Sequence, residues 1–208
     1  MAKVAIKDPA TGAVISKANL KDVRPYWLYD TVTISTTPSD VYAFQTPEGS
    51  DSKGVHDTNL KQFSTIQVGW QFVCDKIRVV PRFIAEQTED AANHLTLLED
   101  LNTIFSNGVL SFYREGDIEV WRAPLVLFTA GCGPMAGVSA SNATDNLAVW
   151  SNGLPSFGSV MKLPVPIILS GGRTFVFKIG FPSGLSLNSS RKLWIVLDGM
   201  LSREVVGG

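Results

Sequence analysis

Residues 70–83, WQFVCDKIRVVPRF, decide the fold class. Apolar residues recur in this stretch at nearly every second position, with polar or charged residues between them. The apolar positions are Phe72, Cys74, Ile77, Val79, Val80 and Phe83. An alternation with a period of two predicts a β-strand that turns one face to the core. The phase slips at Asp75-Lys76, which predicts a bulge or a local twist in the strand.

Strand character continues on both sides of this stretch. The other expected strands are 31–35, 41–46, 109–113, 118–122, 125–128, 160–169, 173–181 and 193–205. Strands do not alternate regularly with helices, which excludes a parallel α/β sheet. Short hairpins mixed with long crossovers favour a Greek-key arrangement over an up-and-down barrel. We therefore predict an all-β fold, a single jelly roll, which is an antiparallel β-sandwich of about eight to nine strands.

One α-helix is expected as an insertion near residues 88–106. Thr88 is the predicted N-cap, and two acidic residues follow it where the helix dipole favours negative charge. Apolar residues at spacings of three and four make one stripe. They are Ala91, Leu95, Leu98, Leu101 and Phe105. Asn107-Gly108 supplies a typical helix C-terminus.

The first 25 residues lack a sustained period and predict an extended N-terminal arm, 1–25, ahead of one jelly-roll domain, 26–208. The arm is locally basic, and its basic residues are candidate contact residues. They are Lys3, Lys7, Lys17, Lys21 and Arg24. Two interpretations stay open. The arm is a solubilising tail, or it contacts a neighbouring molecule or an acidic polymer.

Composition limits the function classes. The chain has 208 residues and a formal net charge of −1, so no global charge attracts nucleic acid or an anionic membrane. Only 18% of residues are charged while 45% are hydrophobic, which predicts an unusually apolar surface that oligomerisation would cover. We expect no signal peptide and no membrane span of about 20 apolar residues, so the chain is expected to be made in a cytoplasm.

The sequence lacks a catalytic signature. Its two histidines, His56 and His94, fit no metal-binding motif, and no nucleophile elbow or phosphate loop is present. Asp117 and Glu119 would share one strand face beside a hairpin turn, where a solvated edge is the expected role. The two cysteines, Cys74 and Cys132, do not suggest a disulfide framework. We therefore expect no enzyme activity, no catalytic residue, no metal and no cofactor.

Two long loops, 47–65 and 130–158, are expected to carry contacts, since loops of this length are rarely mere connectors. Of the five tryptophans, Trp70, Trp121 and Trp194 fall in strand patterns and are expected in the core or an interface. Trp150 lies in the second loop and is the candidate for an exposed contact.

Several blocks of the sequence resemble the jelly-roll capsid or virion structural proteins of icosahedral, non-tailed bacteriophages. The blocks are 44–46, 57–60, 72–80, 108–121, 124–125, 152–155, 163–167, 175–177 and 197–199, with Arg203. The resemblance implies a self-assembling shell subunit located in the virion and made in the host cytoplasm. Its implied partners are copies of itself and other virion proteins, with the basic arm contacting genome or membrane and no small-molecule substrate.

Two other function classes remain open. A carbohydrate- or receptor-binding β-sandwich module would show an exposed aromatic platform, expected near Trp150. A jelly-roll enzyme would show a cleft with converging polar side chains, and the presence of only two histidines argues against it.

Overall fold

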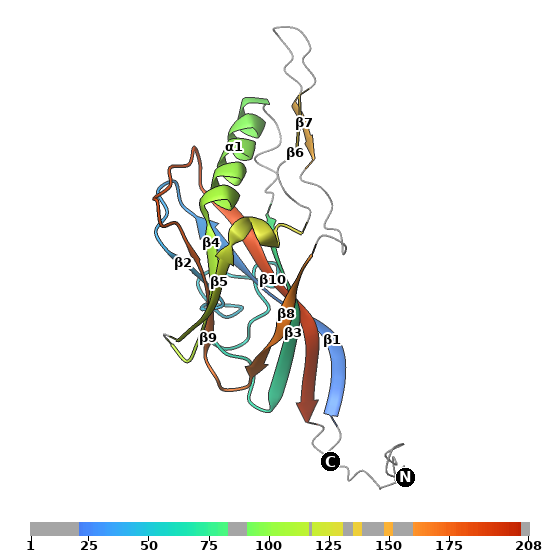
Figure 1. Cartoon of the computed structure of the whole chain (residues 1–208). Coiled ribbons are helices and arrows are strands. Elements are labelled where there is room, and N and C mark those ends of the chain that lie inside the picture. Colours follow the sequence, from blue (N-terminus) through green and yellow to red (C-terminus); the bar gives the residue numbers. More distant parts are fainter. Residues whose placement is uncertain are drawn as a thin grey trace, which may run out of the picture.

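The computed structural model describes residues 21–82, 91–116, 118–130, 135–138, 148–151 and 160–204. Two antiparallel four-stranded sheets pack into a sandwich (Figure 1). The first sheet contains, in spatial order, β1 (Lys21–Ile34), β10 (Arg191–Glu204), β3 (Trp70–Pro81) and β8 (Met161–Ser170). The second contains β2 (Val41–Ala43), β9 (Phe175–Gly180), β4 (Val109–Arg114) and β5 (Ile118–Pro124). The additional elements are α1 (Ala91–Asn107), the 3-10 helix η3 (Leu125–Phe128), and a hairpin of β6 (Met135–Val138) and β7 (Ala148–Ser151).

The strand pairing is that of a jelly roll. In chain order the first strand of the sandwich pairs with the last, β1 with β10, and the second with the seventh, β2 with β9. The third pairs with the sixth, β3 with β8, and the fourth with the fifth, β4 with β5. This is one long antiparallel ribbon rolled into two sheets. The predicted all-β jelly roll with one inserted helix is confirmed.

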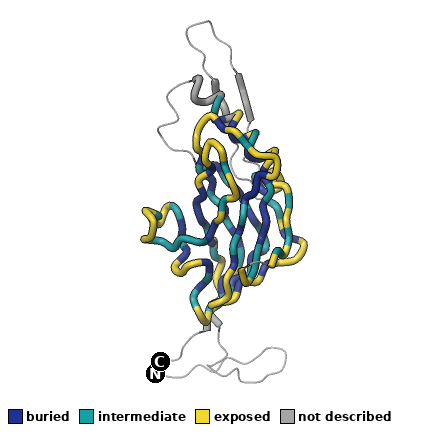
Figure 2. The backbone as a smooth tube through the Cα atoms, turned by 90° about the vertical axis from the view of Figure 1, so that its left-hand side faces the viewer, coloured by how far each residue is buried: buried dark blue, intermediate teal, exposed yellow. Residues whose placement is uncertain are grey.

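Phenylalanine side chains fill the centre of the core. Phe177 on β9 lies 4.8 Å from Phe112 on β4, and 5.6 Å from Phe44, between ring centroids. Trp121 stacks on Phe128 of η3 at 5.8 Å. Buried and exposed positions alternate along the strands (Figure 2), so each sheet turns one face to this core.

The phase slip predicted at Asp75-Lys76 is a β-bulge. Register shifts between Cys74 and Lys76 where β3 pairs with β8, and between Asp198 and Gly199 where β10 pairs with β3. Gly199 is required at this bulge, because a Cβ there would lie 2.0 Å from the carbonyl oxygen of Val73. The bulge lets β3 keep its apolar side chains on the core face on both sides of the slip.

Helix α1 is tied to the sandwich by a buried ion pair. The Asp100 carboxylate, only 2% exposed, accepts hydrogen bonds from Arg191 Nε at 2.7 Å and from the backbone nitrogens of Asn188 and Ser189. Arg191 is itself buried, and its Nη2 lies 2.6 Å from the same carboxylate. The Asn188 side-chain amide donates to it as well, at 3.1 Å, so five donor groups converge on one side chain of the helix.

Other expectations about the elements need correction. Strand β1 begins at Lys21, so residues 21–25 of the expected arm belong to the sheet and pair with β10. Residues 1–20, with Lys3, Lys7 and Lys17, lie outside the described residues. The predicted helix cap Thr88 also lies outside them.

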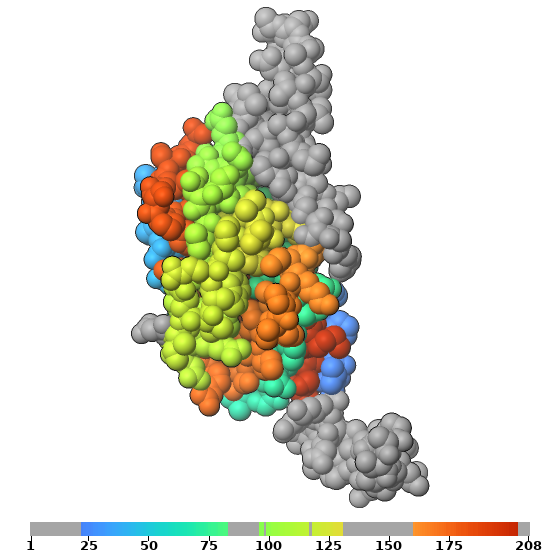
Figure 3. Space-filling view, in the orientation of Figure 1, coloured from blue at the N-terminus to red at the C-terminus, as the bar shows by residue number. Residues whose placement is uncertain are grey.

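The stretch 125–128, expected as a strand, is the 3-10 helix η3. Its residues Leu125 and Phe128 are buried, and η3 lies between α1 and the edges of β5 and β8 (Figure 3). The expected strand 41–46 ends at Ala43, because Phe44 adopts a φ of 65°. The expected loop 130–158 contains the β6–β7 hairpin, which pairs Trp150 with Ala136.

Candidate functional site

The outer face of the first sheet carries apolar side chains, although it faces away from the core. Pro25, Met200, Val73 and Ile168 lie opposite one another in register and cross all four strands. Met200 is 44% exposed and Ile168 is 46% exposed. We call these four residues the apolar row.

The outer face of the second sheet is polar by comparison. The corresponding row there consists of Tyr42, Lys178, Ser111 and Arg122. Lys178 forms an ion pair with Asp40 at 3.1 Å. An antiparallel sandwich with one solvated face per sheet is expected to look like this second sheet. The first sheet departs from that pattern.

An open hollow of about 390 Å³ lies further along the same outer face of the first sheet. Its lining residues come from β1, β10, β3 and the segment before β3. They are Trp27, Tyr29, Val55, His56, Arg78, Trp194 and Val196. Trp27 is 55% exposed and the His56 ring is also exposed, while Tyr29 and Trp194 are partly covered. We call this site the aromatic hollow.

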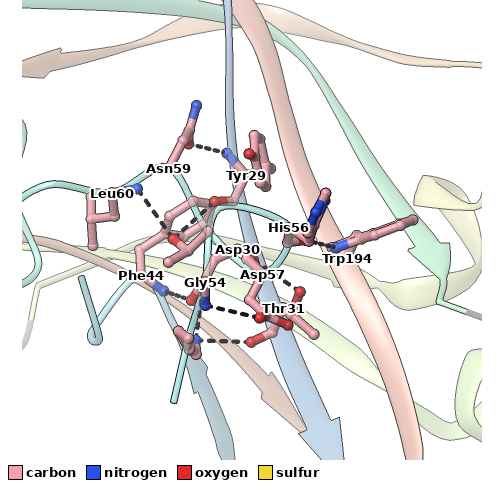
Figure 4. Close-up of polar contacts among 12 residues, drawn as sticks. Tyr29, Asp30, Thr31, Phe44, Gly54, His56, Asp57, Asn59, Leu60 and Trp194 are labelled. Atoms are coloured by element: carbon pink, nitrogen blue, oxygen red, sulfur yellow. Dashed lines mark hydrogen bonds and ion pairs between the residues drawn. The ribbon is translucent and has the colours of Figure 1, made fainter. Parts of the chain in front are cut away.

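The segment 53–59 forms one wall of the aromatic hollow (Figure 4). The Tyr29 hydroxyl donates a hydrogen bond to the carbonyl oxygen of Val55, and the Trp194 indole nitrogen donates to that of His56 at 3.1 Å. Both donors project from the outer face of the sheet. The carbonyl groups of Val55 and His56 therefore lie on the outer side of the sheet, while Thr58 and Asn59 pair with the edge of β1.

A buried carboxylate anchors the wall from below. Asp30, fully buried on β1, accepts hydrogen bonds from Lys53 Nζ at 2.7 Å and from the Phe44 backbone nitrogen at 2.6 Å. Burial raises the pKa of the Asp30 carboxyl, against the lowering effect of Lys53 and these hydrogen bonds. The Tyr29 backbone nitrogen donates to the Asn59 side-chain oxygen, and the Asn59 backbone nitrogen donates to the Tyr29 carbonyl oxygen. These two hydrogen bonds hold the wall against the edge of β1.

Both arginines at the aromatic hollow are neutralised. Arg78 donates two hydrogen bonds to Asp198, at 2.8 and 2.7 Å. Arg82 forms an ion pair with Asp57, and its guanidinium lies 5.4 Å from the Trp194 ring centroid. Partial burial raises the pKa of Asp57, but hydrogen bonds from the Gly54 nitrogen and from Arg82 outweigh it and leave that pKa lowered.

Two smaller hollows occur elsewhere among the described residues. One of about 170 Å³ lies beside Arg114 and Arg173. Arg173 forms an ion pair with Glu115, and Arg114 donates to the carbonyl oxygen of Ile168. The other, of about 20 Å³, lies beside Tyr26 and has room for little more than a water molecule. Neither combines several aromatic rings with an open surface.

Among the described residues, the acidic side chains beside the β4–β5 turn are paired with basic ones. Glu119 accepts hydrogen bonds from Arg122 and from the Tyr113 hydroxyl, which lower its pKa, the Arg122 bond most. Glu115 pairs with Arg173, and Asp117 lies outside the described residues. The turn itself is confirmed, since Gly116 has a φ of 89°.

Among the described residues, no group of three or more histidine, cysteine, aspartate or glutamate side chains is arranged to hold a metal ion. His56 lines the aromatic hollow, while Cys132 falls outside the described part of the chain. Cys74 is a free buried thiol, and its burial raises its pKa to about 12. Within the same residues, no helix has the length and hydropathy to cross a bilayer.

The sequence candidates and the aromatic hollow only partly coincide. Lys21 and Arg24 lie on β1, where the Arg24 guanidinium lies 5.8 Å from the Tyr26 ring centroid. Trp150 lies on β7, and its side chain is outside the described part of the structure. Trp70 and Trp121 pack against the core as expected.

The tryptophans that line the hollow are instead Trp27, which is exposed and was not nominated as a contact, and Trp194, which is partly covered and was expected in the core or an interface. Trp27 could have been found if the strand had been expected to begin earlier, because Trp27 then lies on the face opposite to the buried Leu28. Comparison of the chain with models of known families, with curated proteins and with solved structures finds no match.

Proposed function

We propose that this chain is a structural subunit of a viral shell, a capsid or virion protein of an icosahedral bacteriophage. In this proposal it assembles with copies of itself and with other virion proteins. The observation that carries the proposal is the apolar row on the outer face of the first sheet. The jelly-roll topology and the low charge content of the chain support it.

An apolar row on an outer face is unfavourable in an isolated subunit. Fully burying one Met, Ile or Val side chain is worth roughly 1.5–3 kcal/mol. Met200 and Ile168 each keep almost half of their surface exposed, so covering the row with a second protein surface recovers a substantial part of that free energy. The corresponding row of the second sheet carries Lys178 and Arg122 and is therefore less apolar.

A second copy of the chain is a suitable partner for this row. The adjacent row toward the sheet end consists of Ser202, Gln71 and Ser170, which carry no charge. On this side of the apolar row, a two-fold contact therefore brings only uncharged side chains together. Contact through the face is also favoured over strand addition at β8, because Pro164 and Pro166 cannot donate to a neighbouring strand.

The remaining features of the proposal concern the two ends of the described chain. Lys21 pairs with Glu204, so both ends of the described chain leave the same end of the first sheet. The basic residues before Lys21 would extend from that end toward genome or membrane, and the proposed location is the virion. No catalytic step and no small-molecule substrate are part of this function.

The oligomeric state tests the proposal. Light scattering across protein concentration is expected to show multimers for the wild type. Met200→Glu and Ile168→Glu are each expected to shift the mass toward the 22.5 kDa monomer. Tyr42→Glu is the matched control, because Tyr42 is 46% exposed on the outer face of the second sheet.

Two outcomes would contradict the proposal. One is a wild type that stays a monomer at every concentration. The other is a multimer that Met200→Glu leaves intact while its circular dichroism matches the wild type. Equal disruption by Tyr42→Glu would show that association does not use the apolar row.

A further inference from the structure

The aromatic hollow is a second feature of the same outer face, and the assembly proposal does not use it. Trp27, which lines the hollow, lies in one row with Asp198, Lys76 and Lys162, and this row lies between the apolar row and the rest of the hollow. We propose that the aromatic hollow binds a short, uncharged oligosaccharide. The inference stands independently of the proposed function.

The length of the aromatic hollow suits more than one sugar ring. Trp27 on β1 lies opposite Asp198 on β10, and Trp194 lies four residues away along β10. At a strand rise of about 3.4 Å per residue, the two tryptophans are about 14 Å apart along the sheet. Tyr29 and Val196 lie between them and form the floor. An elongated ligand can therefore stack on a ring at each end.

The aromatic surfaces are held in place before any ligand arrives. The hydrogen bond from the Trp194 indole nitrogen to His56 fixes the ring plane, and the Arg82 guanidinium lies against that ring. The Tyr29 hydroxyl is likewise fixed by the Val55 carbonyl. Rigid side chains lose little conformational entropy on binding, so weak stacking contacts contribute more to affinity.

The charge of the site favours an uncharged ligand. Arg78 is paired with Asp198, and Arg82 with Asp57. Binding single-stranded nucleic acid on an aromatic platform requires unpaired cations along the phosphate backbone. The paired ions instead offer donors and acceptors side by side at the rim, beside the exposed His56 imidazole. Sugar hydroxyls, which both donate and accept, match that arrangement, and sugar C–H groups match the ring faces.

The wall made by residues 53–59 also argues against a flat protein partner. Its backbone carbonyls at Val55 and His56 accept hydrogen bonds from side chains of the outer face, so this part of the wall lies on the outer side of the sheet. A second copy that packs flat on the apolar row meets this wall before it reaches Trp194. A narrow, flexible chain can enter beside the wall.

Saturation-transfer NMR on the full chain tests the proposal with three neutral trisaccharides, namely cellotriose, maltotriose and chitotriose. We expect at least one to bind with a Kd in the range of about 0.1–10 mM. Trp27→Ala is expected to weaken that binding at least about tenfold, because it removes one stacking surface. Trp194→Phe keeps a ring but removes the hydrogen bond to His56, and is expected to weaken binding less.

The matched control is Phe63→Ala, because Phe63 is 66% exposed and does not line the aromatic hollow. This variant is expected to bind the sugar like the wild type. A sialylated trisaccharide and an oligothymidylate are the charged competitors, and a synthetic peptide of residues 1–20 represents a protein ligand.

Three results would overturn the proposal. The first is that none of the neutral trisaccharides binds. The second is binding that Trp27→Ala leaves unchanged in a folded protein. The third is that an acidic glycan, the oligonucleotide or the peptide binds at the aromatic hollow more tightly than every neutral sugar. Light scattering on Trp27→Ala, expected to match the wild type, separates sugar binding from assembly.

Discussion

Replacing Asp100 with alanine tests whether one buried carboxylate holds the inserted helix to the jelly roll. Asp100 on α1 and Arg191 at the start of β10 are both almost fully buried, with a shortest contact of 2.6 Å. In Asp100→Ala the Arg191 guanidinium stays in the interior without its partner. The backbone nitrogens of Asn188 and Ser189 lose their acceptor as well.

The expected loss follows from these contacts. Removing one partner of a buried ion pair destabilises a fold by about 3–5 kcal/mol. For a urea slope of about 2 kcal/mol/M, this lowers the unfolding midpoint by roughly 1.5–2.5 M. In the double variant Asp100→Ala/Arg191→Met the uncompensated buried charge is gone. The double variant is therefore expected to lose less stability than Asp100→Ala alone.

Urea unfolding followed by circular dichroism measures the effect. The control is Glu48→Ala, which breaks the exposed Lys61–Glu48 pair of 2.6 Å and is expected to lower the midpoint much less, because solvent screens that pair. The reasoning is refuted if Asp100→Ala and Glu48→Ala shift the midpoint equally. It is also refuted if the double variant is less stable than Asp100→Ala.

Three further predictions concern the strands of the first sheet. Gly199→Ala is expected to lower the urea midpoint sharply, since its Cβ would meet a backbone oxygen. Gly54→Ala, whose Cβ would come no closer than 3.9 Å to Asp57 Oδ2, should not, and equal midpoints would argue against the bulge. In a Cys132→Ala background, the Cys74 thiol, whose pKa burial raises to about 12, should resist iodoacetamide at about pH 8 until urea unfolds the chain, and rapid native alkylation would contradict this. Burial raises the pKa of the Asp30 carboxyl above 3.8, so the folded state holds that proton more tightly and loses stability as pH rises through the folded pKa. The urea midpoint of the wild type should therefore fall relative to Asp30→Asn between about pH 3 and pH 7, and a constant difference would refute the assignment.

The strands with a clear alternation could be predicted from the sequence, because a period of two records which face meets the core. Phe72 and Ile77 lie on the buried face of β3, and the slip between them is the bulge. The stretch 125–128 could not be predicted, since four consecutive apolar residues fit a strand or a helical turn equally well. The packing of this stretch beside α1, which the local sequence does not show, distinguishes the helical turn from a strand (Figure 3).

The candidate site was largely beyond sequence reasoning, because it depends on register. Trp27 and Trp194 are far apart in the chain and line the same hollow only because β1 pairs with β10. Asp30 reads as an ordinary polar residue before a strand, yet the loop from Lys53 makes it the buried anchor of a wall. Pairing partners at such separations are not recorded in local patterns.

The position of β10 has a consequence for how the protein is made. β10 is the last strand of the sandwich in chain order, yet it lies second in its sheet, between β1 and β3. During synthesis, β1 and β3 therefore cannot form the complete first sheet until β10 has been made. Insertion of β10 pairs segments from opposite ends of the described chain, and such long-range pairing slows folding. A chain cut short before β10 lacks both Met200 and Trp194. Only chains that contain β10 can present either surface, so under the proposed function incomplete products could not assemble.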